Sequence, residues 1–140
     1  MGKYYKSANY RVEIDGISVA SYHKCSIGDL SFPEIVYKEG GGKTYKDYGQ
    51  PQYGDITLSK ASGKENMLYE EWVKPTIDGD DSKAIKDFSI VQTESDGSEV
   101  ARINVYEGRV KTYKPGEFDA ESESFRIEEI VVSSERWEII

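Results

Sequence analysis

The feature that most constrains this chain is a two-residue alternation of apolar and polar side chains in short segments. In residues 10–14 the apolar side chains of Tyr10, Val12 and Ile14 alternate with charged ones. Successive side chains of a strand point to opposite faces, so this pattern is typical of half-buried antiparallel strands. Asp15-Gly16 follows, and an Asp-Gly pair between two alternating segments favours a hairpin. The sequence therefore predicts a mainly β protein.

The same alternation predicts strands along most of the chain, at residues 10–14, 17–22, 34–38, 55–59, 88–93, 100–106, 109–113 and 124–133. Asp96-Gly97 marks a second hairpin, and Gly108 is expected to end one strand before the next begins. About eight strands and one helix predict an antiparallel β-sandwich or small barrel with one flanking α-helix.

One segment favours a helix rather than a strand. Ser62 and Glu65 have the spacing of a capping box, in which each side chain accepts a hydrogen bond from a free backbone N–H of the first turn. Pro75 is expected to end the helix, because proline cannot continue the backbone hydrogen-bond pattern. The apolar side chains expected on the buried face are Met67, Leu68 and Trp72. This helix is predicted to pack on the sheet.

The connection formed by residues 39–54 is unusually long for a compact domain. Loops of this length without secondary structure are uncommon unless they have a function. Tyrosine has a large apolar ring with a polar tip, which suits contacts between proteins. The residues that stand out in this connection are Gly40, Gly41, Gly42, Tyr45, Tyr48 and Tyr53. We therefore expect an extended loop that reaches beyond the domain.

Length and charge limit the remaining possibilities. A chain of 140 residues is expected to form one domain, with a flexible segment at residues 1–8 and a C-terminal tail at residues 136–140. Its formal charge of −8 disfavours sequence-specific nucleic-acid binding, and no apolar run is long enough for a membrane anchor. Cys25 is the single cysteine, and the first residues do not resemble a secretion signal, so synthesis in the cytoplasm is expected.

No nucleophilic or phosphate-binding arrangement is convincing. Gly42-Lys43-Thr44 resembles the end of a phosphate-binding loop, but Tyr37 stands where its first glycine should be and no helix follows. His23 and Cys25 could form a base and a nucleophile on one strand face, yet no second histidine supports them. Cys25 is better interpreted as a small buried apolar residue. We expect no catalytic residues and no cofactor.

The acidic side chains do not predict a specific site either. Asp78, Asp80 and Asp81 do not fit a calcium-binding loop, because Gly79 comes too early and the closing glutamate is missing. Neighbouring carboxylates such as Glu128-Glu129 point to opposite faces of a strand, which does not suit a glycosidase pair. We expect no metal site and no enzymatic activity.

The order of the segments resembles the tail tube proteins of contractile phages and of phage-like contractile injection systems. Each matching segment is short, so the resemblance rests on order and spacing over roughly residues 9–135. The segments that carry it are Asp15-Gly16, Cys25-Ser26, residues 33–41, residues 54–59, Trp72, and residues 90–93, 101–108, 114–120 and 124–132.

The resemblance implies a structural protein that assembles as hexameric rings. In that family the inner strands of the subunits join edge to edge into one barrel, and the rings stack into a hollow tube. Joining the strands removes unpaired sheet edges, which otherwise promote aggregation. Alternation would then point Ile35, Tyr37, Ile56 and Leu58 toward the core. The residues that would line the lumen are Glu34, Lys38, Asp55, Thr57, Ser59, Arg126 and Glu128.

The resemblance also implies the partners of the chain. The extended loop of residues 39–54 would contact neighbouring rings through Gly40, Gly41, Gly42, Tyr45, Tyr48 and Tyr53. Further partners would be a contracting sheath, a baseplate, and a tape-measure protein, protein cargo or DNA in the lumen. The chain would be made in the bacterial cytoplasm and join a virion tail or phage-tail-like particle. Both a main tube subunit and a terminal ring subunit fit the sequence.

A second hypothesis belongs to a different class of function. A monomeric β-sandwich module that binds carbohydrate or peptide could use some of the 11 tyrosines as its platform. The two hypotheses differ in assembly, because a binding module stays monomeric whereas a tube protein forms rings or filaments.

Overall fold

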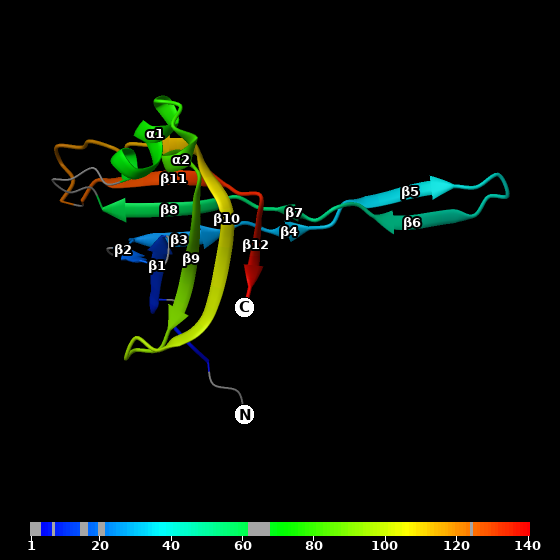
Figure 1. The fold of residues 1–140 in the computed structure, drawn as a ribbon, viewed down its shortest axis with the longest axis horizontal. Coiled ribbons are helices and arrows are strands. Elements are labelled where there is room, and N and C mark those ends of the chain that lie inside the picture. Colours follow the sequence, from blue (N-terminus) through cyan, green and yellow to red (C-terminus); the bar gives the residue numbers. More distant parts are fainter. Residues whose placement is uncertain (1–3, 7, 15–16, 20–21, 62–67, 124) are drawn as a thin grey trace.

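The computed structural model describes residues 4–6, 8–14, 17–19, 22–61, 68–123 and 125–140. Most of these residues form antiparallel strands, and a small helical region lies at one end of the body (Figure 1). The strands are β1 (Tyr10–Ile14), β2 (Ile17–Val19), β3 (Lys24–Ile27), β4 (Leu30–Ser31), β5 (Glu34–Lys38), β6 (Thr44–Tyr48), β7 (Gln52–Tyr53), β8 (Ile56–Ala61), β9 (Lys86–Thr93), β10 (Glu99–Lys114), β11 (Ile127–Ser133) and β12 (Arg136–Ile139). The helical segments are the π-helix η1 (Tyr69–Val73), α1 (Lys74–Ile77) and α2 (Asp81–Ala84). The predicted mainly β class with a flanking helix is confirmed.

Two sheets share the long strand β10. Sheet I has the order β2-β1-β9-β10, with β12 also paired to the first half of β10. Sheet II has the order β10-β11-β8-β3. Residues 99–108 of β10 pair with β9, and residues 109–114 pair with β11. The antiparallel pairs β1-β2 and β9-β10 confirm both predicted hairpins, although Asp15 and Gly16 themselves lie outside the described residues.

β10 changes partner at Gly108 without ending. Glu107 has a φ of 53°, and a bulge interrupts the pairing with β9 at this point. A Cβ atom on Gly108 would lie 2.9 Å from Cε1 of Phe88 and 3.0 Å from Cγ1 of Val132. Only glycine lets the backbone pass this close to both side chains. The prediction that a strand ends at Gly108 is therefore wrong.

The hydrophobic core lies between the two sheets and is closed at one end by the helical region. Leu68 and Trp72 are both fully buried, as predicted, and the Trp72 ring contacts Phe88 edge-on at a centroid distance of 5.5 Å. The strand residues of this core include Val12, Ile90 and Val105 of sheet I and Ile56, Leu58, Ile130 and Val132 of sheet II.

The helical region differs from its prediction in extent. Pro75 does not end it, because η1 continues directly into α1 and Pro75 is the second residue of α1. The helix ends at Ile77 and is followed by Gly79, whose φ of 72° is typical of a helix C-terminus. α2 then forms within the polar stretch that begins at Asp78. The predicted capping box of Ser62 and Glu65, and the helical position of Met67, lie outside the described residues.

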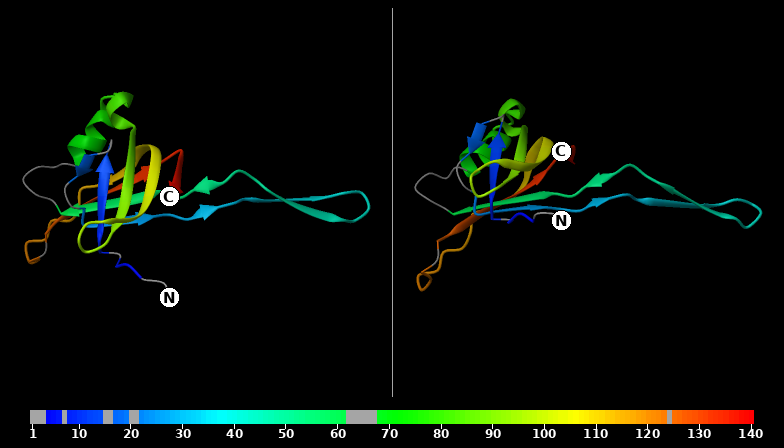
Figure 2. Two further views of the ribbon diagram at one scale, coloured as in Figure 1. Left: turned by 60° about the horizontal axis from the view of Figure 1, so that its bottom comes forward. Right: turned by 90° about the horizontal axis from the view of Figure 1, so that it is seen from below.

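A long two-stranded arm leaves the body at one end of sheet II (Figures 1 and 2). The arm is residues 30–53, in which β4 pairs with β7 and, farther out, β5 pairs with β6. Residues 39–54 are therefore not a loop without secondary structure, and residues 34–38 belong to the arm instead of the main sheet. Ile35 and Tyr37 are each 50% exposed, so their predicted core positions are wrong. Ile56 and Leu58 are fully buried, as predicted.

The C-terminal residues are part of the fold. Residues 136–139 form β12, which pairs with residues 103–106 of β10. This corrects the expectation of a free tail from residue 136 onward. Trp137 of β12 also packs against the core between the sheets.

Candidate assembly surfaces

The outer half of the arm has an uncovered apolar surface. One face carries Ile35, Tyr37 and Tyr45, and the two tyrosine rings stack at a centroid distance of 5.4 Å. On the other face Lys46 forms a 3.2 Å ion pair with Glu34 across the two strands. A two-stranded hairpin with uncovered apolar side chains is marginally stable alone, so this surface indicates contact with another molecule. Other exposed apolar side chains of the arm are Leu30, Phe32, Val36 and Tyr48.

The base of the arm is held tightly against the body. A Cβ atom on Gly54 would lie 2.5 Å from the backbone nitrogen of Asp29, so only glycine fits where the two chain segments meet. The ring of Tyr53 contacts Trp137 of β12 edge-on at 5.6 Å. The indole Nε1 of Trp137 also donates a hydrogen bond to the carbonyl oxygen of Gly54 at 3.3 Å. These contacts fix the direction in which the arm leaves the body.

The six residues predicted to contact neighbouring rings all lie on the arm. Gly40, Gly41 and Gly42 form the turn at its tip, where a φ of 86° at Gly42 requires glycine. Tyr45 and Tyr48 lie on β6, and Tyr48 is 72% exposed. Tyr53 differs from the others because it lies at the base and packs on the body. Their contacts with other copies stay a prediction.

Sheet II has one buried face and one polar face. On β8 the buried Ile56 and Leu58 alternate with Thr57 and Ser59, which point to the opposite side. Asp55, just before β8, accepts a hydrogen bond from Nζ of Lys111 at 3.1 Å. We call this side the polar face of sheet II; its members by register and alternation are Lys24, Ser26, Asp55, Thr57, Ser59, Glu129 and Val131.

Three of the predicted lumen residues, Asp55, Thr57 and Ser59, share this polar face. Sequence reasoning missed Lys24 and Ser26 of β3, which lie beside Ser59 and Thr57. The alternation of apolar and polar residues could have identified Lys24 and Ser26, because they alternate with the partly buried Cys25 and Ile27. This alternation is hard to recognise in the sequence, because β3 has only four residues.

Glu128 does not lie on the polar face. Its side chain is on the same side of β11 as Ile130 and Val132 and is only 2% exposed, which corrects the expectation of a lumen position. The Tyr113 hydroxyl donates a hydrogen bond to Oε1 of Glu128 at 2.7 Å. Burial, together with this carboxylate, raises the pKa of Tyr113 to about 12. Glu128 is therefore part of the interior.

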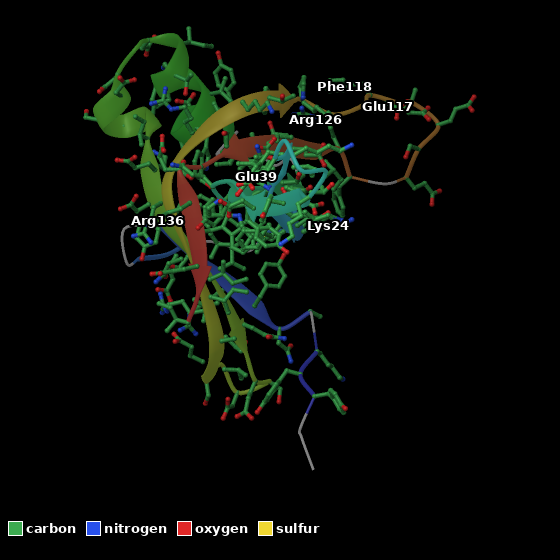
Figure 3. The ribbon with its side chains drawn as sticks, turned by 90° about the vertical axis from the view of Figure 1, so that its right-hand side faces the viewer. Lys24, Glu39, Glu117, Phe118, Arg126 and Arg136 are labelled. Atoms are coloured by element: carbon green, nitrogen blue, oxygen red, sulfur yellow. The ribbon has the colours of Figure 1, made fainter. Side chains whose placement is uncertain are left out.

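The other predicted lumen residues lie away from the four-stranded sheet. Glu34 and Lys38 are on β5 of the arm, so the expectation that they share a wall with Thr57 is wrong. Arg126 precedes β11, and its guanidinium lies over the Phe118 ring at 4.8 Å (Figure 3). The same guanidinium donates a hydrogen bond to the carbonyl oxygen of Pro115.

Sheet II has two free edges within the described ranges. β3 pairs only with β8, and residues 109–114 of β10 pair only with β11. Each neighbouring pair in this sheet is antiparallel, so its two edge strands run in opposite directions. Free strand edges expose N–H and C=O groups that can pair with another strand. Both edges of sheet II are therefore available for pairing.

Cys25 and His23, which were considered as a nucleophile and its base, have surroundings that favour a structural role. Burial raises the pKa of the Cys25 thiol to about 11, although a hydrogen bond with Tyr10 acts in the opposite direction. The thiolate, which is the nucleophilic form, is therefore disfavoured. His23 is exposed, and its backbone N–H donates to the carbonyl oxygen of Ser59 at 2.7 Å. This hydrogen bond extends the contact between β3 and β8.

The acidic turn has a local role. Oδ1 of Asp80 accepts a hydrogen bond from the Ser82 hydroxyl at 2.6 Å, at the start of α2. In the described part of the chain, no three His, Cys, Asp or Glu side chains are grouped so that they could hold a metal ion. Among the same residues, no helix has the length and apolar character needed to span a membrane.

The family of the chain follows from a match over most of its length. A family model described as T4-like virus tail tube protein gp19 matches residues 6–138. This chain belongs to the gp19 tail tube family. The order of the sequence segments indicated a resemblance to contractile tail tube proteins, and this resemblance is therefore confirmed.

Solved structures of tube-like proteins have the same fold as this tail tube family member. A chain from the anti-feeding prophage cap, described as the AFP tube terminating cap, is 25% identical with a TM-score of 0.85, over 100% of this chain and 93% of that chain. A chain from the PVC sheath/tube terminator of an extracellular contractile injection system is 22% identical with a TM-score of 0.84, over 99% and 98%.

A third structure comes from the main part of such a particle. A chain from the PVC sheath-tube complex in the extended state is 23% identical with a TM-score of 0.82, over 97% of this chain and 90% of that chain. A comparison with curated proteins found no match. The similarities thus include both terminator and sheath-tube structures, and they do not favour a monomeric carbohydrate- or peptide-binding module.

Proposed function

We propose that this tail tube protein is the structural subunit of a hexameric ring, and that the rings stack into the inner tube of a contractile tail or injection particle. The observation that carries the proposal is sheet II, a four-stranded sheet with a free strand edge on each side and a polar face. Tail tube membership and the similarity to tube and terminator structures support it.

Rotational symmetry explains how the two free edges would pair. A rotation about the tube axis leaves the direction of each strand along that axis unchanged. The edge strands β3 and β10 run in opposite directions, so β3 of one copy would meet β10 of its neighbour as an antiparallel pair. Repeating this pairing around the ring would give one continuous antiparallel barrel and leave no free edge.

The polar face of sheet II would then line the lumen. The opposite face is occupied by the hydrophobic core, so only the polar face can border the hole of the barrel. Thr57 supplies a hydroxyl group, Ser59 is only 5% exposed, and Glu129 is paired with Lys114 at 3.3 Å. A wall of uncharged polar groups and paired charges has little attraction for charged cargo. Both protein and DNA are compatible with it.

The proposed partners follow from this arrangement. A contracting sheath would surround the tube, a baseplate would lie at its end, and a tape-measure or cargo molecule would lie in the lumen. Passage through a rigid conduit needs no catalytic turnover, so the protein would act without enzymatic activity. The net charge of −8 does not favour sequence-specific binding to nucleic acid.

Cross-linking across the proposed seam tests the ring. Ser26→Cys and Thr112→Cys place thiols on the two free edges, in a Cys25→Ala background that removes the native cysteine. Both native side chains are exposed, so these changes should leave the fold intact. A short bis-maleimide reagent is expected to give a ladder that ends at a covalent hexamer, and electron microscopy should show rings.

A matched control places the second thiol away from the seam. Ser98 lies in the turn between β9 and β10 in sheet I, so Ser26→Cys with Ser98→Cys should not give the ladder. A protein that remains monomeric at every concentration and gives no ladder would contradict the ring and favour the binding-module hypothesis.

A further inference from the structure

Basic side chains of the edge strand β10 extend the polar face of sheet II. Arg109 comes just before Val110, which lies opposite Val132 and packs against the core. Successive side chains of a strand alternate, so Arg109 points to the polar side. Lys111 is on the same side, because its ammonium group forms an ion pair with Asp55 at 3.1 Å. β10 thus adds cations to the wall of the proposed lumen.

The register of the strands places the other charged side chains of this face. Lys114 lies opposite Glu129 on β11, and Lys24 lies opposite Ser59 on β8. Figure 3 shows Lys24 on the side of sheet II that faces away from Arg136 of sheet I. The basic residues of the polar face are Lys24, Arg109, Lys111 and Lys114, and its acidic residues are Asp55 and Glu129.

The polar face has more cations than anions, although the chain as a whole has a net charge of −8. In its two ion pairs the lysine is the more exposed partner, with 61% for Lys111 against 36% for Asp55 and 64% for Lys114 against 31% for Glu129. Lys24 and Arg109 are exposed and form no ion pair with another described residue. A molecule in front of this face would therefore meet positive charge first.

A ring would strengthen the attraction of this face for anions. Sixfold repetition would place the same cations all around the lumen, and a concave surface lined by one sign of charge concentrates molecules of the opposite sign. Paired groups contribute little to such attraction. Lys24 and Arg109, which stand outside the pairs, would therefore decide which cargo the wall prefers.

Charge density distinguishes two classes of anionic cargo. Duplex DNA carries one negative charge per about 1.7 Å of its axis, and each neutralised phosphate releases a counterion, so a cationic wall repeated along a tube would hold DNA tightly. An acidic polypeptide has fewer charges over the same length. Its uncharged side chains also suit Thr57, Thr112 and Val131, which form one row across the wall. Passage needs release as well as attraction, which favours the polypeptide.

We propose that the lumen takes an acidic polypeptide as its cargo, and that Lys24 and Arg109 attract it. This inference rests on the proposed function, because the polar face borders a hole only in a ring. It assigns a chemical class to the cargo, whereas the paired charges of the wall are compatible with both protein and DNA.

Removing the two unpaired cations tests the proposal. Lys24→Gln with Arg109→Gln makes the wall less positive and leaves both of its ion pairs in place. The probe is a fluorescein-labelled peptide with glutamate at every third position, mixed with assembled protein at low salt. Its Kd, measured by fluorescence anisotropy, should rise at least about tenfold in this variant. Binding to the unmodified protein should weaken as salt is added, because salt screens the attraction.

The matched control removes one lysine and one arginine elsewhere. Lys74 of α1 and Arg136 of β12 lie away from the polar face, and their side chains are 57% and 54% exposed. Lys74→Gln with Arg136→Gln changes the net charge by the same amount and should leave the Kd of the peptide unchanged. Equal weakening in both double variants would overturn the proposal, since it would show a response to net charge alone.

A second variant keeps the free edges intact. Lys24 and Arg109 lie on the edge strands β3 and β10, so their loss could disturb ring formation. Thr57→Lys adds a cation on the central strand β8 and should lower the Kd of the peptide by at least about threefold. An unchanged Kd in rings of this variant would contradict the attraction.

Electron microscopy of each variant separates the cargo from the ring. Rings that bind the peptide equally well with and without Lys24 and Arg109 would overturn the acidic cargo and leave the ring proposal intact. An oligodeoxythymidylate with the same number of charges should dissociate more slowly than the peptide, and faster dissociation would overturn the choice of protein over DNA. A protein that forms no rings at all would overturn both proposals.

Discussion

The body and the arm of this protein use similar residues in opposite environments. In the body, Leu58 of β8 is fully buried between the two sheets. On the arm, Ile35 and Val36 of β5 are 50% and 55% exposed, although they belong to an alternating segment of the same kind. An apolar strand residue thus identifies a surface that must be covered, but its covering can come from the same chain or from another molecule. Five experiments can break or sharpen this distinction.

The largest effect is expected at Trp72. Its side chain is fully buried and contacts Phe88, so Trp72→Ala should remove about 3–5 kcal/mol from the free energy of unfolding. Tyr37→Ala on the arm should change it by less than about 0.5 kcal/mol in unassembled protein. Urea unfolding followed by circular dichroism measures both. Equal losses for the two variants would contradict a separate core in the body.

Gly108 should be the next most sensitive position. A Cβ atom there would meet Phe88 and Val132 at 2.9 Å and 3.0 Å, so Gly108→Ala should cost about 1–3 kcal/mol through overpacking. The matched variant is Gly41→Ala at the arm tip, where a Cβ atom would meet nothing within 4 Å. Thermal unfolding should show a lower Tm for Gly108→Ala than for the unmodified protein. The Tm of Gly41→Ala should be almost unchanged.

A loss of similar size is expected when the buried Glu128 loses its donor. Tyr113→Phe removes the hydroxyl that donates to Glu128 at 2.7 Å, which should cost about 1–3 kcal/mol at neutral pH. Tyr48→Phe on the arm is the control, because Tyr48 is 72% exposed. Chemical denaturation of both variants would test this, and a neutral Tyr113→Phe would contradict a stabilising role for the pair.

The same tyrosine predicts the response to alkaline pH. The pKa of Tyr113 is raised to about 12 in the folded protein, above its ordinary value of 10.0. Its protonated form therefore stabilises the fold fully below pH 10, and this contribution is lost as the pH rises from 10 toward 12. Burial also raises the pKa of Tyr10 and of Tyr22 to about 12, so the unmodified protein should lose stability over this range. Tyr113→Phe should show a shallower loss in pH-dependent unfolding.

The smallest effect on the body is expected from shortening the arm. Residues 34–48 can be replaced by Asn-Gly, because the backbone N–H of Gly49 already donates to the carbonyl oxygen of Pro33 at 2.6 Å. The free energy of unfolding should change by less than about 0.5 kcal/mol, since the extensive contacts of the removed strands β5 and β6 are with each other. A replacement of residues 119–122, in the connection between β10 and β11, by the same dipeptide is a control for the effect of shortening a loop on folding. A large loss of stability in the arm variant would contradict the independence of the two regions.

Much of the body could be predicted from local patterns. The two Asp-Gly turns, the alternation around Ile56 and Leu58, and the helical spacing of Leu68 and Trp72 each depend on residues close in sequence. Glu128 could not be placed in the same way, because Ile130, Val131 and Val132 are consecutive apolar residues and leave the face of β11 undefined. Its position depends on the pairing of β11 with β8 and β10, which joins distant parts of the chain.

The amino-acid sequence alone determined that this chain forms antiparallel strands with one helical region, and its segment order indicated a tail tube protein. Local backbone preferences and side-chain periodicity are sufficient for such conclusions. Only the tertiary structure decided that residues 34–38 leave the body in an arm, that β10 continues through Gly108 into a second sheet, and that β3 is a free edge. These features depend on which strands pair, and pairing is set by the packing of the whole core, because an alternating segment presents the same pattern to every partner.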